Sequence, residues 1–229
     1  MPILVYSHGV VTRGSTDPVL LAEADGRAWL TKLQPPPMLD HLAELVVAAL
    51  AVRMGVQTPD FRIATVEPGL AHALAAGEPR EARLGGAISH LGHRVFASLW
   101  LSGAADVTEP PAGDPEVLTR VLALDLLVAN PDRRYDHPNL LRHGGRLFAM
   151  DHAQALPWCR EQGVEEGLAE RHVATALGLA PARIVLSESE INAAVDIAPR
   201  EWWPSEAARE ATICALAERA RQLARGALR

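Results

Sequence analysis

Residues 130–152 read NPDRRYDHPNLLRHGGRLFAMDH, and this stretch does most to decide the fold. It follows a strongly apolar segment, residues 115–128, that predicts a helix stopping at Asn130-Pro131, because the residue before a proline avoids helical backbone angles. Asp132 stands in the acid-rich loop directly after that helix. It could simply cap the loop or pair with Arg133. Its position in the chain, shortly after a buried helix, favours a functional role.

A second acid ends the same stretch. Residues 140–150 predict a short hairpin with its turn at Gly144-Gly145 and an apolar second strand. Asp151 follows that strand, and the end of a buried strand is a usual place for a metal ligand. Polar residues between the two acids could present a further ligand or serve as ordinary turn residues: Asp136, His137 and Asn139.

Lys32 is the single lysine among 22 lysines and arginines. It lies in residues 28–33, an alternating stretch that predicts a strand after an Asp25-Gly26 turn. Arginine can replace lysine in most surface roles, but its guanidinium fits less well where a compact ammonium must lie between two phosphate oxygens. The lysine could be a compositional accident. The two acids described above favour a phosphate-binding role.

Phosphoryl transfer from ATP depends on positioning and charge stabilisation, and the chain has a candidate for each part. Gly14-Ser15 lies in a turn between the first two predicted strands, where small residues could approach phosphates, although most such turns are only turns. Glu44 lies on a predicted helix beside its buried side, where a carboxylate usually has a cationic partner. Lys32 would bridge phosphates, Asp132 would face the attacking hydroxyl and Asp151 would hold Mg²⁺.

The pattern of elements predicts an α+β chain with two lobes. Residues 1–102 form a β-rich lobe with one helix, and residues 103–229 form a mainly helical lobe, with the loop of residues 103–115 as the boundary. Strands are expected at residues 2–11, 19–23, 28–33, 59–66 and within 94–101, and helices at residues 38–54, 115–128, 164–177, 188–197 and 205–228.

Composition restricts the class of protein. A formal net charge of −6 without a basic run argues against binding nucleic acid. No window has the roughly 18 apolar residues of a membrane span, and no signal peptide is visible, so a cytoplasmic location is expected. The two cysteines, Cys159 and Cys214, lack metal-ligand spacing, which fits a reduced compartment. Abundant alanine and arginine suggest a GC-rich bacterial genome.

The segments around the two acids resemble the catalytic and metal-binding segments of the HipA-like kinases. Residues 130–141 and 146–152 carry the likeness, in the compact single-domain form whose Asp-Arg loop and terminal Asp-His are similar to those of phosphoinositide kinases. Gly14-Ser15, Lys32 and residues 43–46 also resemble the front half of that family. The likeness spans roughly residues 10–205 and implies a bilobal protein-kinase-like fold that binds Mg-ATP.

The resemblance also implies a role for each candidate. Lys32 would contact the α and β phosphates and pair with Glu44, Asp132 would be the base or orienting acid for the acceptor hydroxyl, and Asp151 would hold Mg²⁺. A backbone hinge for adenine would fall at Ser98, Leu99, Trp100 and Leu101. Gly14 and Ser15 would contribute to the phosphate-binding turn.

The chain departs from the family pattern at two places. His137 stands where the family commonly has the metal-binding asparagine, five residues after the catalytic aspartate. Asn139 matches a second asparagine of the compact relatives, and it is the favoured ligand because imidazole binds Mg²⁺ less well than an amide oxygen. Ala153 replaces a glycine that the family more often has after the Asp-His pair.

The sequence therefore predicts a kinase that transfers the γ-phosphoryl group of ATP to a hydroxyl, with a protein serine or threonine as the expected acceptor. One alternative is a nucleotide-binding pseudokinase that acts as a regulatory module. A second alternative is a kinase of small molecules or lipid head groups, and a more distant one is transfer of AMP. The resemblance does not imply the DNA-binding partner of some HipA kinases, since no helix-turn-helix or basic face is visible.

Overall fold

The computed structural model describes residues 3–10, 18–32, 38–75, 94–108 and 114–228. Contacts divide the chain into two units, residues 1–41 with 59–102 and residues 42–58 with 103–229. The first unit ends at Ser102, next to the predicted lobe boundary. The predicted first-lobe helix, however, groups from Leu42 onward with the second unit. The lobes as residues 1–102 and 103–229 stay a prediction.

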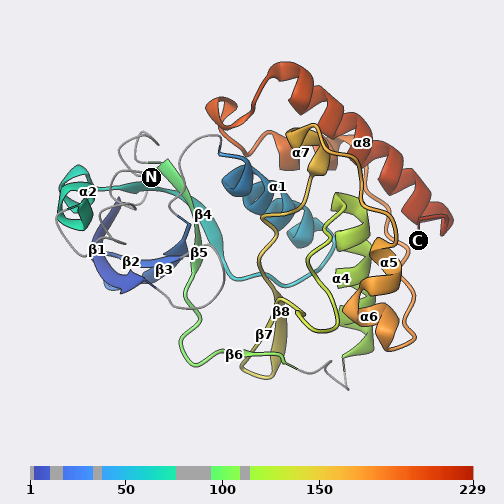
Figure 1. Cartoon of the computed structure of the whole chain (residues 1–229), viewed down its shortest axis with the longest axis horizontal. Coiled ribbons are helices and arrows are strands. Elements are labelled where there is room, and N and C mark those ends of the chain that lie inside the picture. Colours follow the sequence, from blue (N-terminus) through green and yellow to red (C-terminus); the bar gives the residue numbers. More distant parts are fainter. Residues whose placement is uncertain (1–2, 11–17, 33–37, 76–93, 109–113, 229) are drawn as a thin grey trace. The chain divides into compact units, whose positions relative to one another are not determined.

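Five strands of the first unit form a closed barrel in the order β1-β2-β3-β5-β4 (Figure 1). Neighbouring strands are antiparallel except at the closure, where β1 and β4 run parallel. The three strands predicted at residues 2–11, 19–23 and 28–33 are confirmed, and they pair as adjacent antiparallel strands. The elements of this unit are β1 (Ile3–Val10), β2 (Val19–Glu23), β3 (Ala28–Thr31), β4 (Phe61–Val66), α2 (Pro68–Ala75) and β5 (Arg94–Leu99).

The β2–β3 hairpin turns at the predicted Asp25-Gly26. Gly26 has a φ of 85°, a left-handed angle that glycine adopts without steric cost. The Asp25 carboxylate accepts hydrogen bonds from Arg27 N at 3.0 Å and Arg27 Nε at 2.7 Å, which close the turn. The resulting register pairs Val19 with Thr31. Lys32 therefore follows the last paired residue of β3.

A polar cluster stabilises the barrel wall. Glu23, only 8% exposed, accepts hydrogen bonds from Trp29 Nε1 and from Arg62 Nη1, both at 3.0 Å. The Arg62 guanidinium carbon lies 3.8 Å from the Trp29 ring centroid, in cation–π geometry. Burying a carboxylate costs free energy unless it is paired, and these contacts supply the pairing.

The helix α1 (Leu39–Arg53) is buried at every residue from His41 to Ala51. A helix that is apolar on all sides belongs in a core rather than on a surface. Gly55, with a left-handed φ of 67°, lies two residues after the helix, which ends within one residue of the predicted bound at residue 54.

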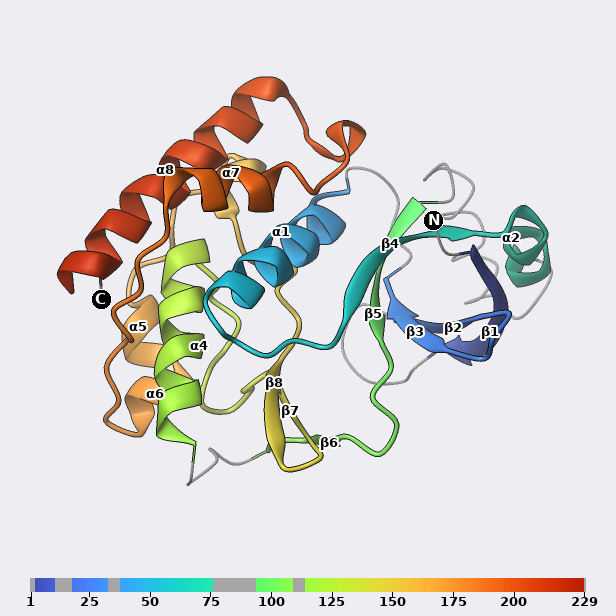
Figure 2. The same cartoon turned by 180° about the vertical axis from the view of Figure 1, so that it is seen from behind.

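The second unit is mainly helical and carries one small sheet, β6-β7-β8 (Figure 2). Helix α4 and the β7–β8 hairpin match the predictions closely, and α4 and α8 pack against each other. The elements are β6 (Ala105–Asp106), α4 (Pro115–Val128), β7 (Leu140–His143), β8 (Arg146–Ala149), η1 (Pro157–Arg160), α5 (Leu168–Arg171), α6 (Val173–Ala176), α7 (Glu188–Val195), η2 (Arg200–Trp202) and α8 (Glu206–Arg225).

The single helix predicted for residues 164–177 is wrong. The structure has two one-turn helices there, α5 and α6, which are separated by His172 in an extended conformation (φ −68°, ψ 141°). The His172 backbone pairs with Arg134 in an isolated β-bridge, and its ring caps α6 by accepting a hydrogen bond from Ala174 N at 3.0 Å. These contacts to the loop outweigh the helical period of the segment.

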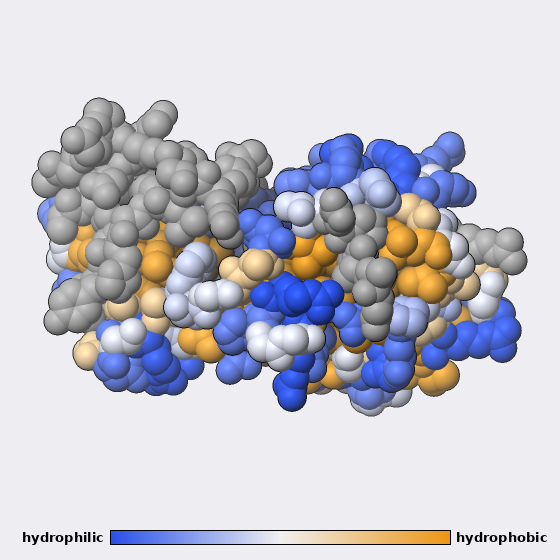
Figure 3. All heavy atoms as spheres, turned by 90° about the horizontal axis from the view of Figure 1, so that it is seen from below, coloured by the Kyte–Doolittle hydropathy of each residue, from blue (hydrophilic) through white to orange (hydrophobic). Residues whose placement is uncertain are grey.

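The surface view in Figure 3 shows hydrophilic residues interspersed with smaller apolar areas. Both cysteines are free, with Cys159 buried and Cys214 exposed. Burial raises the pKa of the Cys159 thiol, which lies 3.0 Å from Thr212 Oγ1. No helix within the described residues is long and apolar enough to span a membrane. Gly14 and Ser15 lie outside the described residues.

Candidate functional site

The end of α4 sets the course of the loop that holds Asp132. Ala129 leaves the helix with a left-handed φ of 52°, and Asn130 N–H donates back to the Asp125 carbonyl oxygen at 2.9 Å. Pro131 then prevents the helix from continuing. Asn130 Oδ1 accepts a hydrogen bond from Asp132 N at 3.3 Å, so the backbone of Asp132 is held by the residue that ends the helix.

Asp132 and Asn139 are in direct contact. Asn139 Nδ2 donates to Asp132 Oδ2 at 3.1 Å and to the Asp132 carbonyl oxygen at 3.2 Å. Both partners are acceptors, so the amide must present its NH₂ group to them. The amide oxygen of Asn139 is therefore turned away from Asp132. Asn139 has a positive φ of 48°, which asparagine tolerates better than most residues.

The Arg133 side chain links the segment around Asn139 to the segment that precedes Asp151, and it is fully buried, at 1% exposure. Its guanidinium donates to the carbonyl oxygens of Pro138 and Asn139, and to that of Met150 at 3.3 Å. The first two carbonyls border Asn139, and the third directly precedes Asp151. A planar guanidinium with five donors suits this task because it can hold several acceptors in one fixed geometry.

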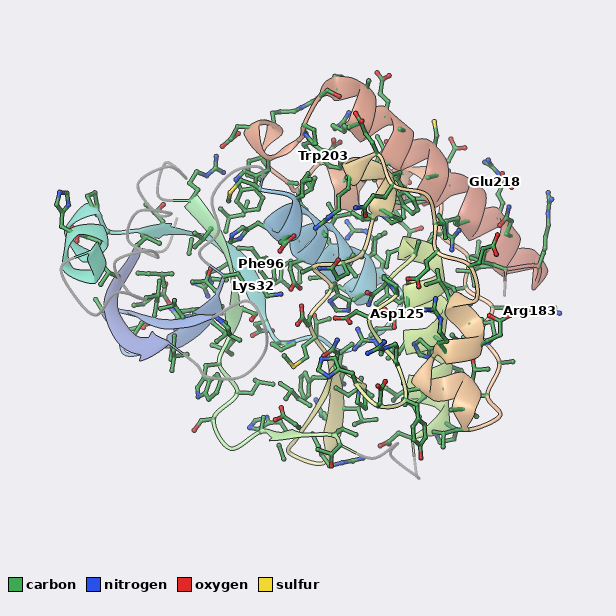
Figure 4. All side chains as sticks on the ribbon, viewed as in Figure 1. Lys32, Phe96, Asp125, Arg183, Trp203 and Glu218 are labelled. Atoms are coloured by element: carbon green, nitrogen blue, oxygen red, sulfur yellow. The ribbon has the colours of Figure 1, made fainter. Side chains whose placement is uncertain are left out.

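Asp125 balances the charge of Arg133 inside the core. Figure 4 labels this residue, which lies on α4, and it is 1% exposed. Its Oδ2 accepts from Arg133 Nε at 2.6 Å and from His172 Nε2 at 2.9 Å, and its Oδ1 accepts from Asn130 Nδ2 at 2.9 Å. Burial raises the pKa of this carboxyl, but the charge of Arg133 and the His172 hydrogen bond outweigh burial and hold the pKa well below its usual range.

The β7–β8 hairpin delivers Asp151 to the same region. Met150 N–H donates to the Asn139 carbonyl oxygen at 3.1 Å, so the start and the end of the hairpin are bonded to each other. Asp151 then turns with a left-handed φ of 56° and is half-buried. The predicted metal ligands thereby lie at one end of the hairpin, with Asn139 directly before β7 and Asp151 two residues after β8.

Glu44 of α1 contacts the segment that follows Asp151. Its Oε2 accepts a hydrogen bond from His152 N at 3.1 Å and lies 3.7 Å from His152 Nδ1. The other ring nitrogen, Nε2, lies 3.0 Å from Arg133 Nη2 and must accept, because arginine only donates. His152 is therefore the Nδ1–H tautomer, whose N–H faces Glu44. The structure thus joins Glu44 to the loop of Arg133 through His152.

In the first unit, hydrogen bonds to the backbone fix the residue next to Lys32 and two residues of the predicted hinge. Lys32 is half-buried and directly follows Thr31, whose hydroxyl donates to the Phe96 carbonyl oxygen at 2.6 Å. In Figure 4, Lys32 and Phe96 are both labelled on this unit. Within the hinge, Leu99 N–H donates to Asp60 O at 2.7 Å and Trp100 N–H donates to Ala28 O at 2.9 Å.

His137 occupies a different setting from Asn139. Its backbone forms an isolated bridge with Arg134, at 3.1 and 3.2 Å, and its side chain is exposed. Within the residues that the structure describes, no cluster of three or more histidine, cysteine or acidic residues could hold a metal. A Mg²⁺ site that uses one or two protein carboxylates and substrate phosphates does not require such a cluster.

The sequence pattern did not predict a role for the four residues that support the site: Asp125, Arg133, His172 and Asn130. One signal could have identified the first of them. Asp125 is an acid within the apolar run of residues 115–128, and a buried acid almost always has a partner. Its partner His172 lies 47 residues away, and nothing local in the sequence points to it.

Comparisons with known proteins agree with this architecture. The chain aligns with the crystal structure of a Helicobacter pylori proinflammatory kinase, CtkA, with a TM-score of 0.55 at 11% identity, covering 99% of this chain and 96% of that one. The fold is therefore kinase-like. The family model for HipA-like kinases matches residues 7–227. The chain belongs to the HipA-like kinase family and is a phosphotransferase. No curated protein matches the sequence.

Proposed function

We propose that this chain transfers the γ-phosphoryl group of ATP, with Mg²⁺, to the hydroxyl of a protein serine or threonine. The observation that carries the proposal is the Asp132–Asn139 pair, at 3.1 Å, within a loop that the buried Arg133 holds from both sides. Phosphoryl transfer needs an acid and a metal ligand in fixed positions, because positioning supplies most of the rate. The choice of a protein acceptor rests on the family alone.

In this proposal Asp132 orients the acceptor hydroxyl or accepts its proton. The Asn139 amide holds Oδ2, which leaves Oδ1 to face the hydroxyl. The backbone of Asp132 is held by Asn130 at 3.3 Å and its side chain by Asn139, so the carboxylate is fixed before the substrate arrives. Such preorganisation avoids a reorganisation cost during the reaction.

The chemistry of the donors fits a Mg²⁺ ion. Asn139 Oδ1 is turned away from Asp132, and Asp151 lies two residues after β8, at the same end of the hairpin as Asn139. Amide and carboxylate oxygens are ligands that Mg²⁺ accepts, with phosphate and water completing its shell. When bound, the ion would neutralise developing charge on the phosphates. Asn139 rather than His137 is proposed as the second ligand.

For the remaining parts of ATP, roles are proposed mainly for residues of the first unit. Lys32 is proposed to contact the α and β phosphates and to pair with Glu44, and Gly14-Ser15 is proposed to approach the phosphates. At the hinge, Leu99 and Trp100 already donate their N–H groups within the sheet, and Ser98 is paired with Leu30. Leu101 is therefore the hinge residue proposed to donate its N–H to adenine.

Thermal melting tests nucleotide and metal binding directly. ATP at about 100 times its dissociation constant is expected to stabilise the chain by roughly 2.7 kcal/mol, a rise in melting temperature of about 5–10 °C at this size. The rise should require Mg²⁺, because Asp151 and Asn139 would hold the nucleotide through the ion. A rise that is the same without Mg²⁺ would favour the pseudokinase, and no rise with any nucleotide would contradict ATP binding.

Labelled ATP tests the reaction. Incubation with γ-labelled ATP should transfer label to a protein acceptor, whereas α-labelled ATP should transfer none. Transfer of the α label would indicate AMP transfer. Screening proteins beside hydroxylated metabolites and lipid head groups in the same assay identifies the acceptor class, and label confined to small molecules would overturn the protein acceptor.

The Lys32→Arg variant tests the phosphate contact. The guanidinium is broader than an ammonium and should not fit between two phosphate oxygens, so we expect turnover to fall by roughly 10-fold or more while the melting temperature without ATP is unchanged. The control is Arg225→Lys, which makes the reverse exchange at an exposed surface position and should leave turnover unchanged. Normal turnover of Lys32→Arg would show that the lone lysine is a compositional accident.

A further inference from the structure

The last four main-chain carbonyl groups of α4, those of Asp125, Leu126, Leu127 and Val128, receive no hydrogen bond from an N–H group within the helix. Residues that follow the helix satisfy two of them. Asn130 N–H donates to the Asp125 carbonyl and Leu156 N–H donates to the Val128 carbonyl, both at 2.9 Å. From the residues that directly follow the helix, the Leu126 carbonyl receives a long contact of 3.4 Å, from Ala129 N.

Arg219 of α8 satisfies the middle two carbonyls from a distant part of the sequence. Its Nε donates to Leu126 O at 2.8 Å and to Leu127 O at 3.1 Å, and its Nη2 also donates to Leu126 O. Arg219 lies 93 residues after Leu126. The guanidinium thus links the C-terminal helix to the turn that immediately precedes the Asp132 loop.

The surroundings of Arg219 differ from those of its neighbours on α8. Arg209 and Arg221 pair with carboxylates, as surface arginines usually do. For Arg219, by contrast, no carboxylate partner occurs among the residues that the structure describes, and burial lowers its pKa. The cation is oriented instead on the negative end of the α4 dipole, where a positive charge is stabilising.

We propose that Arg219 is a positioning residue for catalysis, which fixes Asp132 by holding the last turn of α4 from α8. This inference rests on the proposed function, because it assigns Asp132 the acceptor hydroxyl. The path is short: Arg219 holds Leu126 and Leu127, and Asn130 begins the loop two residues after α4 ends. A small displacement of that turn moves Asp132 relative to the acceptor, and a displacement of about 1 Å can lower a rate roughly 100-fold.

The experiment compares Arg219→Met with Leu223→Ala in the full chain. Leu223 lies one helical turn further along α8 and is buried, so its truncation loosens α8 without touching the α4 carbonyls. Both variants should melt at lower temperature than the wild type. Measured well below both melting temperatures, kcat of Arg219→Met should fall roughly 10- to 100-fold with KM for ATP within about twofold, whereas kcat of Leu223→Ala should stay near wild type.

Hydrogen exchange of the amides of residues 129–133 provides a readout that does not depend on activity. Exchange there should accelerate in Arg219→Met and not in Leu223→Ala. Equal kcat values in the two variants, or equal exchange, would overturn the inference and reduce Arg219 to a stabilising contact. If the wild type transfers no phosphate to any acceptor, the proposed function fails, and the exchange comparison alone decides on the positioning of the loop. Arg219→Gln replaces the methionine variant if the latter does not fold.

Discussion

Replacing Asp132 with asparagine is expected to lower the rate of phosphoryl transfer by about 10²- to 10⁴-fold while ATP binding is retained. The amide keeps the shape of the carboxylate but cannot accept the proton of the acceptor hydroxyl. Asn139 can still face the residue, so the loop should keep its conformation. The measurements are the initial rate with γ-labelled ATP and the rise in melting temperature with Mg-ATP.

Asp136→Asn is the matched control for this variant. Asp136 lies in the same loop, but its side chain is 74% exposed and only faces Arg134 at 3.5 Å. Its substitution should leave the rate within about twofold, as for surface changes away from a site. An Asp132→Asn variant as active as the control would remove Asp132 from the mechanism. A wild type without any transfer but with normal ATP binding would favour the pseudokinase.

Replacing Arg133 with methionine is expected to destabilise the fold by about 3–5 kcal/mol, because it leaves the Asp125 charge buried without its cation. At this chain length the loss corresponds to a fall in melting temperature of roughly 6–20 °C. The pair is fully buried, at 0% and 1% side-chain exposure, with a separation of 2.6 Å between Arg133 Nε and Asp125 Oδ2. Calorimetry or urea melting measures the change.

The control is an ion pair of the same length on the surface. Arg171 Nη1 and Glu165 Oε1 are also 2.6 Å apart, but their side chains are 43% and 51% exposed. Arg171→Met should cost about 1 kcal/mol or less. The double variant Asp125→Asn with Arg133→Met should recover part of the loss, since it removes both charges. If Arg133→Met and Arg171→Met cost the same, burial does not govern the Arg133 pair.

Acid pH offers an independent check on Asp125. Its pKa is lowered in the folded chain, so its contribution to stability is fully present above the unfolded-state pKa of about 4 and is lost as pH falls from there toward the folded-state pKa. Asp125→Asn should therefore show a smaller loss of stability between about pH 5 and pH 3 than the wild type. Urea melts across this range measure the difference.

Much of the local structure could be predicted from the sequence because it depends on local forces. Pro115 and Asn130-Pro131 delimit α4, and the observed helix has the predicted bounds, Pro115–Val128. Asp25-Gly26 and Gly144-Gly145 are turn sequences, and both form the predicted hairpins. Of the candidate residues in the second unit, Asp132, Asn139 and Glu44 are joined by hydrogen bonds through Arg133 and His152, and Asp151 directly precedes His152.

The tertiary structure decided how those residues are held. Arg133 and Asp125 are eight residues apart, yet their pairing depends on His172 and Met150, which lie much further along the chain. The same contacts break the predicted helix of residues 164–177 at His172, because the bonds to Asp125 and Arg134 require an extended backbone there. A helical period records which residues are apolar. It contains no information about a distant hydrogen-bond partner.

The sequence by itself thus determined the kinase-like class, the order of most of the strands and helices, and the choice of the candidate acids. The element order follows from short-range spacing and turn chemistry, whereas the kinase-like class and the roles of the acids follow from the resemblance of residues 130–152 to the HipA-like kinases. Only the tertiary structure decided that Arg133 would be buried against Asp125, that His152 would turn its Nδ1–H to Glu44, and that Arg219 would close α4. The physical reason is that buried charges must be satisfied, and the groups that satisfy them are chosen by packing rather than by proximity in the chain.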